Sequence, residues 1–200
     1  IDLFSAADAG APAGDTWHNV GLVYGDWQPM EALLKDRSLL DRTAFADYYL
    51  FVNLIGATDN ITKNLYLCWD GSRFYPMPWD LDAAFGRLYT AAPSDPEVWY
   101  GGGLYEALLQ ETDFQALLGE RWALWRGALS PESVMAYFEA QYKLLDACGA
   151  WQREAQRFGA YTDSATGLTY AFAPGEELQF IRDYLIRRFA LVDAMYGGAP

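Results

Sequence analysis

The sequence predicts a mainly α-helical domain of the α+β class that carries one small β-hairpin. Helix-type apolar patterns and capping residues recur along the chain, most clearly in residues 41–57. Residues 65–69 and 74–77 form short aromatic and aliphatic runs typical of strands, and Asp70 and Gly71 between them are a strong hairpin signal. Because 52% of the 200 residues are hydrophobic, the chain can bury the core of one domain.

Two helices are predicted before the hairpin. Residues 29–36 form one or two turns, after a lead-in rich in Ala, Gly and Asp with a short strand at residues 20–24. Residues 41–57, DRTAFADYYLFVNLIGA, are apolar on nearly all faces after the first turn, and Gly56 ends this run. A helix with so little polar surface belongs at the centre of the domain.

An irregular loop and a third helix are predicted after the hairpin. Residues 87–103 contain two prolines and end in three consecutive glycines, which we expect to be flexible. No strand precedes these glycines, so they do not form a phosphate-binding loop. The next helix begins at Thr112, has Gln115 at the capping-box position and stops at Gly127.

Two more helices complete the predicted fold. Ser130 is an N-cap followed by a first-position proline and a first-turn acid, and it opens a long helix towards Phe158. A turn-rich stretch, residues 159–175, precedes the last helix, which Gly197 ends. The arginines of this helix, Arg188 among them, are expected to offset the acidic surface or to cap the C-terminal half of the helix. One apolar stripe marks its inner face: Leu178, Ile181, Leu185, Phe189 and Val192.

The charge balance excludes two classes of partner. With a net charge of −13 and a pI near 4.3, the chain lacks the clustered Lys and Arg that nucleic acid or an anionic membrane surface requires. We expect no membrane insertion, because no apolar run approaches the ~18 residues of a membrane helix.

Cys68 and Cys148 are too few and too far apart for a disulfide scaffold or a zinc site, and both are predicted to be free thiols. His18 has no Ser or Cys nearby in the sequence and is expected to be a surface or hydrogen-bonded histidine.

Residues 59–86 contain almost every candidate for chemistry. Asp59 and Asn64 stand five positions apart, the predicted hairpin follows, and Asp80 and Asp82 come directly after it. This order of a loop aspartate, an asparagine, a hairpin and a further aspartate matches the core of a phosphoryl-transfer site.

Phosphoryl transfer requires a divalent metal ion held against the phosphates and a carboxylate that orients the attacking hydroxyl. Magnesium prefers hard oxygen ligands and usually takes one or two carboxylates, with water and phosphate completing its shell. Asn64 and Asp80 are expected to face each other across the mouth of the hairpin and hold the metal ion. Asp59 is then left to act as the catalytic base or as the group that orients the attacking hydroxyl.

Neighbouring residues are expected to support this site. Asp82 would take a second metal ion or support the first one. Lys63 would reach a phosphate, and Trp79 or Phe85 would wall the site.

The same acids also have other interpretations. Asp-Asn after a helix and Asp-Gly in a hairpin are ordinary turn chemistry, and Asp80 and Asp82 would cap a helix that begins near Ala83. A binding or scaffold module would use the acids to hold calcium, or would leave them unused. A glycoside hydrolase would use Asp59 and Asp80 as its pair of carboxylates, but Asn64 has no necessary part in that scheme. The order and spacing of the whole set favour the phosphoryl-transfer site.

At these residues the sequence resembles the CotH family of spore-coat proteins, which are atypical protein kinases with a kinase-like fold. The resemblance lies in the Asp-x-x-x-x-Asn element at residues 59–64, the Leu-Tyr-Leu strand after it, and Pro-Trp-Asp-Leu-Asp-x-x-Phe-Gly at residues 78–86. It extends over residues 40–196, and the Pro-Trp-Asp motif is fairly specific.

The resemblance implies the helical C-terminal lobe of a protein-kinase-like fold. It also implies ATP and Mg²⁺ or Mn²⁺ as ligands, with phosphate transfer to serine or threonine of a partner protein. By matching position, Asp59 is the catalytic-loop acid, and Asn64 and Asp80 are metal ligands. An acidic domain suits a basic, Ser-rich substrate, and the family points to the spore coat or to a secreted or cell-surface location.

The N-terminal lobe of the family, which covers the nucleotide, has no counterpart in this sequence. Residues 1–40 are too short to build it and contain no Gly-rich loop after a strand. We expect residues 1–40 to be a lead-in or linker, and residues 41–200 to be the C-terminal lobe of a longer protein that is catalytically weak by itself. A non-catalytic pseudokinase, acting as a surface or spore-coat scaffold, is the alternative.

Overall fold

The computed structural model describes residues 28–198, except residues 163, 165, 166 and 172. The strand predicted at residues 20–24 and the interpretation of His18 lie outside the described residues. The described part confirms a mostly helical fold, with seven α-helices, two short 3₁₀ helices and two antiparallel hairpins. In chain order these are α1 (Gln28–Lys35), η2 (Arg37–Leu39), α2 (Arg42–Ile55), η3 (Thr58–Asn60), β1 (Leu65–Trp69), β2 (Phe74–Pro78), α3 (Tyr105–Leu108), α4 (Thr112–Arg126), α5 (Pro131–Ala147), α6 (Ala150–Arg157), β3 (Ala160–Thr162), β4 (Thr169–Ala171) and α7 (Pro174–Tyr196).

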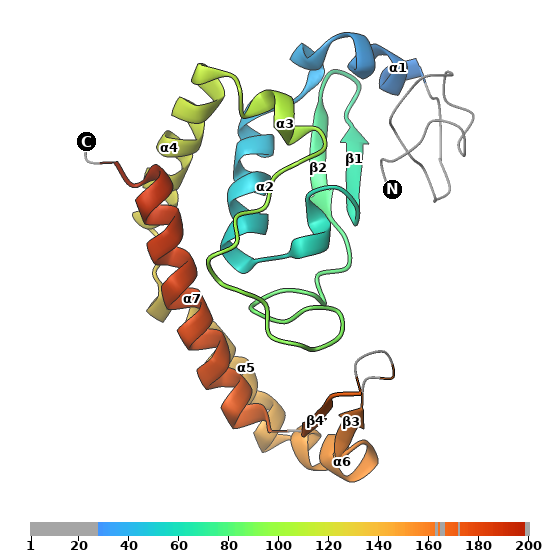
Figure 1. Cartoon of the computed structure of the whole chain (residues 1–200), viewed down its shortest axis with the longest axis vertical. Helices are drawn as coiled ribbons and strands as arrows, with labels where there is room; N and C mark the ends of the chain where they lie inside the picture. Colours follow the sequence, from blue (N-terminus) through green and yellow to red (C-terminus); the bar gives the residue numbers. More distant parts are fainter. Residues whose placement is uncertain (1–27, 163, 165–166, 172, 199–200) are drawn as a thin grey trace.

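Helix α2 occupies the centre of the fold, as its apolar sequence predicts. It contacts β2 on one side and α4 and α7 on the other (Figure 1). Asp41 caps its N-terminus by accepting a 2.8 Å hydrogen bond from the backbone N–H of Ala44. Gly56 ends it in the left-handed conformation, with φ 65°, and donates its backbone N–H back to the last turn.

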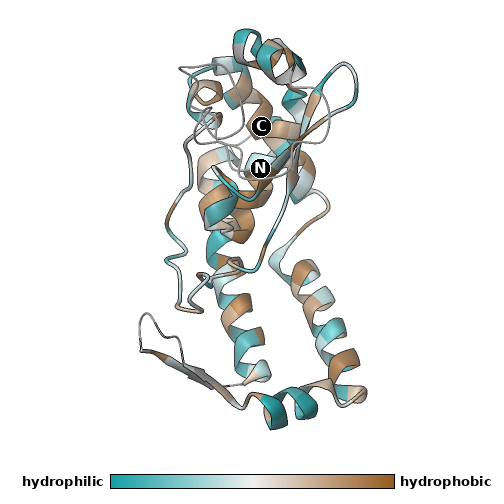
Figure 2. Ribbon diagram, turned by 90° about the vertical axis from the view of Figure 1, so that its right-hand side faces the viewer, coloured by the Kyte–Doolittle hydropathy of each residue, from teal (hydrophilic) through white to brown (hydrophobic). Residues whose placement is uncertain are grey.

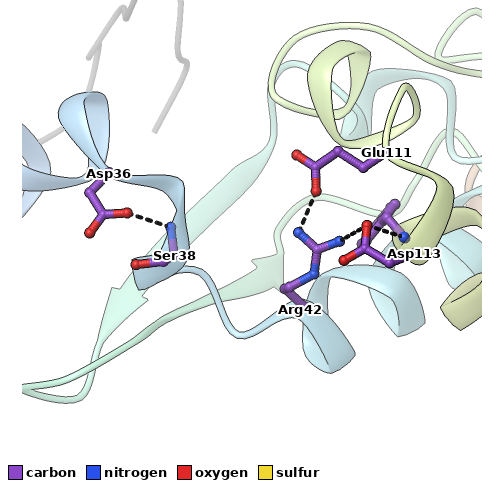
Figure 3. A network of polar contacts seen from close by, with 6 residues as sticks. Asp36, Ser38, Arg42, Glu111 and Asp113 are labelled. Carbon is purple, nitrogen blue, oxygen red and sulfur yellow. Dashed lines mark hydrogen bonds and ion pairs between the residues drawn. The ribbon is translucent and has the colours of Figure 1, made fainter.

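An ion-pair cluster ties the start of α2 to the start of α4. Figure 3 shows the guanidinium of Arg42 between two acids, with Nη1 2.5 Å from Glu111 and Nη2 3.1 Å from Asp113. Glu111 is also the N-cap residue of α4, although its side chain caps nothing. The helix begins at Thr112 as predicted, but its N-cap is Glu111. The predicted capping box of Thr112 and Gln115 is therefore wrong, and Gln115 donates to the carbonyl of Leu109 instead.

The predicted long helix from Ser130 to Phe158 is two helices. Ser130 forms the expected cap, with its hydroxyl accepting from the N–H of Ser133. The chain leaves α5 at Gly149, which has φ 71°, and α6 then crosses the foot of the long helices as a mostly hydrophilic element (Figure 2). A second hairpin, β3 with β4, lies in the stretch predicted to be rich in turns.

The first hairpin forms where the sequence places it. Leu65 pairs with Pro78 at its open end, and Trp69 pairs with Phe74 next to the turn. Leu65 and Phe74 are buried, and β2 contacts α2, so one face of the hairpin covers the central helix.

Helix α7 packs along α2, α4 and α5 through its predicted stripe. Leu185, Phe189 and Val192 are buried in the core. Arg188, expected at the surface or at a helix end, is instead fully buried. Within the described residues, no helix is both long and apolar enough to cross a membrane. Both cysteines are free thiols, as predicted.

Candidate functional site

The predicted acids lie where α2 passes into the first hairpin. After Gly56 the chain makes the short η3 turn, which carries the half-buried Asp59. Gly56 also permits close packing here, because a Cβ at this position would stand 1.8 Å from the hydroxyl oxygen of Tyr184. The end of the central helix is thereby fixed against α7, and with it the turn that bears Asp59.

Asn60 organises the open end of the hairpin, although no sequence pattern singles it out. Its side chain is buried, and Nδ2 donates to the carbonyl oxygens of Asn64 at 2.9 Å and Trp79 at 2.7 Å. The backbone N–H of Trp79 also donates to Asn64 O at 2.9 Å. The Tyr48 hydroxyl donates to the carbonyl of Asn60 at 2.8 Å, and burial raises the pKa of this hydroxyl, so it stays a protonated donor.

Asn64 and Asp80 flank this closed mouth, so the structure brings the two predicted metal ligands to the same end of the hairpin. Both have left-handed backbones, with φ 53° for Asn64 and φ 56° for Asp80. Asn and Asp tolerate this conformation better than most residues, which explains why these types stand here. Among the described residues, none donates a hydrogen bond or forms an ion pair to the exposed carboxylates of Asp80 and Asp82.

Asp59 and Lys63 form an ion pair across one helical turn. Lys63 Nζ lies 2.8 Å from Asp59 Oδ2, and both side chains are partly exposed. Lys63, predicted to reach a phosphate, is therefore placed where it also orients the candidate base.

Trp79 stands at the rim of the site. Its side chain is 58% exposed, and its ring meets Tyr66 edge-on at a centroid distance of 5.6 Å. The two rings pack together at the end of the hairpin that precedes Asp80, and the role of Trp79 as a wall of the nucleotide site stays a prediction.

The interpretation of Asp80 and Asp82 as helix caps is wrong, because no helix begins near Ala83 in the described chain. The segment stays irregular and returns to the end of α2. The backbone N–H of Phe85 donates to Ile55 O at 2.6 Å, and the Phe85 ring packs edge-on against Phe138 on α5. Phe85 therefore anchors the segment and does not line the mouth with Trp79.

The donor set fits a magnesium or manganese ion that shares its shell with phosphate. Within the described residues, no three His, Cys, Asp or Glu side chains are placed to hold one metal ion. A zinc cage or a carboxylate-rich calcium site is therefore absent from that part of the chain. Asn64, Asp80 and Asp82 offer the few hard oxygens that magnesium takes from a protein when phosphates and water supply the rest.

Comparison with protein-family models gives a match to the model described as CotH kinase protein, over residues 30–192. This range includes α2, the first hairpin, the candidate site and most of α7. No curated protein and no solved structure matches the chain.

Proposed function

The chain belongs to the CotH kinase family, and on this premise we propose that it transfers the γ-phosphate of ATP to a serine or threonine of a partner protein. Membership in a kinase family implies ATP as the phosphate donor. The observation that supports the proposed site is the mouth closed by Asn60, which brings Asn64 and Asp80 together beside the turn of Asp59.

Each residue then has a role set by its place. Asp59 orients the acceptor hydroxyl and accepts its proton as the oxygen attacks the γ-phosphorus and the bond to the β-phosphate oxygen breaks. Lys63 holds the Asp59 carboxylate through their ion pair. Asn64 and Asp80 would hold a divalent metal ion, and Asp82 would support it or hold a second one. When bound, such an ion would neutralise the negative charge that develops on the phosphate.

The partner is a basic, Ser-rich protein in this proposal. A chain with a net charge of −13 attracts basic partners and speeds their encounter. We place the protein in the spore coat or at a secreted or cell-surface location, which the family description supports by association alone.

Phosphate transfer from labelled ATP tests the proposal. The natural full-length protein would be incubated with Mg²⁺ or Mn²⁺ and a basic Ser-rich test protein, beside Asp59→Asn, Asp80→Asn and the control Glu120→Gln. Glu120 is exposed on α4, outside the site, and the control removes one negative charge as the other variants do. We expect transfer by the wild type and the control and loss of transfer in both aspartate variants. No transfer by a folded wild type would instead support a pseudokinase or scaffold.

A further inference from the structure

The irregular segment of residues 87–103, which follows Asp80 and Asp82 in the chain, is anchored to the central helix α2 by a buried asparagine. Asn53 on α2 is fully buried. Its side chain makes two hydrogen bonds to the backbone of Tyr100, with Tyr100 N donating to Oδ1 at 2.8 Å and Nδ2 donating to Tyr100 O at 3.1 Å. This paired contact fixes the backbone of the segment at one point.

Arg188 fixes the same segment at two more points. Its side chain is fully buried, and Nη1 donates to the carbonyl oxygens of Pro96 at 2.7 Å and Val98 at 2.5 Å. Nε donates to the carbonyl of Asn53 at 2.9 Å, so the guanidinium bridges α2 and the segment. Among the described residues no carboxylate forms an ion pair with Arg188, and burial lowers its pKa. The guanidinium also lies over the rings of Trp99 and Tyr100, with centroid distances of 5.7 and 5.9 Å. Burying a cation without an ion-pair partner is costly, and these contacts with the segment offset that cost.

The anchored segment ends in the glycine triplet beside the candidate site. Gly102 and Gly103 have φ 124° and 55°, and a Cβ on Gly103 would lie 3.3 Å from Cγ2 of Thr62. Thr62 belongs to the turn between Asp59 and Asn64. Gly102 and Gly103 also accept hydrogen bonds from the first N–H groups of α3. The triplet, expected to be a flexible loop, is thus held at both ends and remains accessible at the surface.

We propose that Gly102 and Gly103 form a wall of the acceptor site, over which an extended stretch of the partner protein passes to bring its hydroxyl to Asp59. This inference rests on the proposed phosphoryl transfer. Because glycine has no side chain, another backbone can approach it closely. Because the segment is already anchored, binding a peptide against it does not cost the conformational entropy of ordering a loop. The nucleotide and metal ion belong at the hairpin mouth, so the side of the turn that Thr62 faces is left for the acceptor.

The test uses a small steric change beside Thr62. Gly103→Ala places a methyl against Thr62 Cγ2 and also strains the left-handed backbone at φ 55°. Gly101→Ala adds the same methyl without either effect, because a Cβ there meets only ordinary contacts at 3.9 Å. Transfer kinetics of the natural full-length protein would be measured with a fluorescein-labelled Lys- and Ser-rich peptide. We expect Gly103→Ala to raise the KM for the peptide about tenfold, a fraction of what a 1 Å misplacement costs. The KM for ATP is expected to stay near that of Gly101→Ala. The melting temperature should fall below that of Gly101→Ala, because an alanine at φ 55° strains the backbone. Adding Thr62→Ser, which removes Cγ2, should restore the KM for the peptide.

The remaining outcomes separate this inference from the proposed function. If the wild type transfers phosphate and Gly103→Ala behaves like Gly101→Ala, or if both KM values rise together, the acceptor wall is wrong while the activity stands. If the folded wild type transfers nothing, the proposed function fails. Binding of the labelled peptide, measured by fluorescence anisotropy, then tests whether Gly102 and Gly103 contact the partner protein. Weaker binding by Gly103→Ala than by Gly101→Ala supports the wall, and equal binding or none rejects it.

Discussion

The side-chain amide of Asn60 donates a 2.7 Å hydrogen bond to the carbonyl oxygen of Trp79, 19 residues further along the chain. Through this contact the turn after α2 holds the strand that ends beside Asp80. The candidate base and the candidate metal ligand are thus joined by one buried side chain that itself performs no chemistry.

Asn60→Asp tests this link. The substitution keeps the shape but removes the donor, so it sets a carboxyl group against two carbonyl oxygens. We expect the free energy of unfolding in urea to fall by about 2–3 kcal/mol, the cost of leaving buried polar groups unpaired. Gln110→Glu, on an exposed side chain, makes the same chemical change as a control. Equal stability of the two variants would show that Asn60 does not hold the mouth closed.

Asp70 in the hairpin turn gives a prediction in pH. Its carboxylate accepts hydrogen bonds from the backbone N–H groups of Arg73 and Ser72, and these lower its pKa from the ordinary 3.8 to about 2. Because the folded state favours the ionised form, the stabilisation is fully present above about pH 4, near the unfolded pKa. It is lost as the pH falls towards 2.

The carboxyl carbon of Asp70 in an NMR titration should therefore have a midpoint near pH 2. The stability advantage of the wild type over Asp70→Asn should shrink between pH 4 and pH 2. An Asp70 midpoint near the ordinary value would contradict the turn geometry.

Lys63 either holds the Asp59 carboxylate through their ion pair or binds a phosphate of ATP, and the kinetics of a variant distinguish the two roles. If it serves Asp59, Lys63→Met should lower kcat roughly tenfold, a part of what general base catalysis contributes, and leave the KM for ATP unchanged. The stability change should stay below about 0.5 kcal/mol, because the pair is partly exposed and spans one turn. A raised KM for ATP with an unchanged kcat would assign Lys63 to a phosphate.

Local signals in the sequence sufficed for much of this fold. The apolar run of α2, its end at Gly56, the cap at Ser130 and the stripe of α7 all depend on neighbours in the sequence, and the structure confirms them. The sequence also predicted that Asn64 and Asp80 lie at the same end of the hairpin, as they do in the structure, whereas their role as metal ligands stays a prediction.

Features that depend on distant contacts could not be predicted. Asn60 and Arg188 act on carbonyls far along the chain, and a polar side chain in the sequence gives no sign of being buried. The break at Gly149 was missed because a single glycine is tolerated within a helix, and its left-handed φ appears only in the structure.

Arg188→Lys should be the most damaging conservative change in α7. A lysine cannot reach all the carbonyls that the guanidinium binds, so we expect a loss of about 3 kcal/mol in urea unfolding. Arg187→Lys, on an exposed neighbour, should change little. Hydrogen exchange at Tyr100 N–H should also speed up in Arg188→Lys. Retention of full stability would show that the carbonyls of Pro96 and Val98 do not depend on this cation.

Asp80 and Asp82 should differ in their effect on metal binding. Asp80 follows the strand end that Asn60 holds, whereas Asp82 lies two residues further into the irregular segment. Titration of Mn²⁺ in the presence of a non-hydrolysable ATP analogue should therefore show the larger loss for Asp80→Asn. We expect at least about tenfold weaker binding, since even residues behind the ligands cost 10–100-fold. Because both carboxylates are exposed, neither variant should change the melting temperature. A larger loss for Asp82→Asn would move the metal from the hairpin mouth towards the segment that Phe85 anchors.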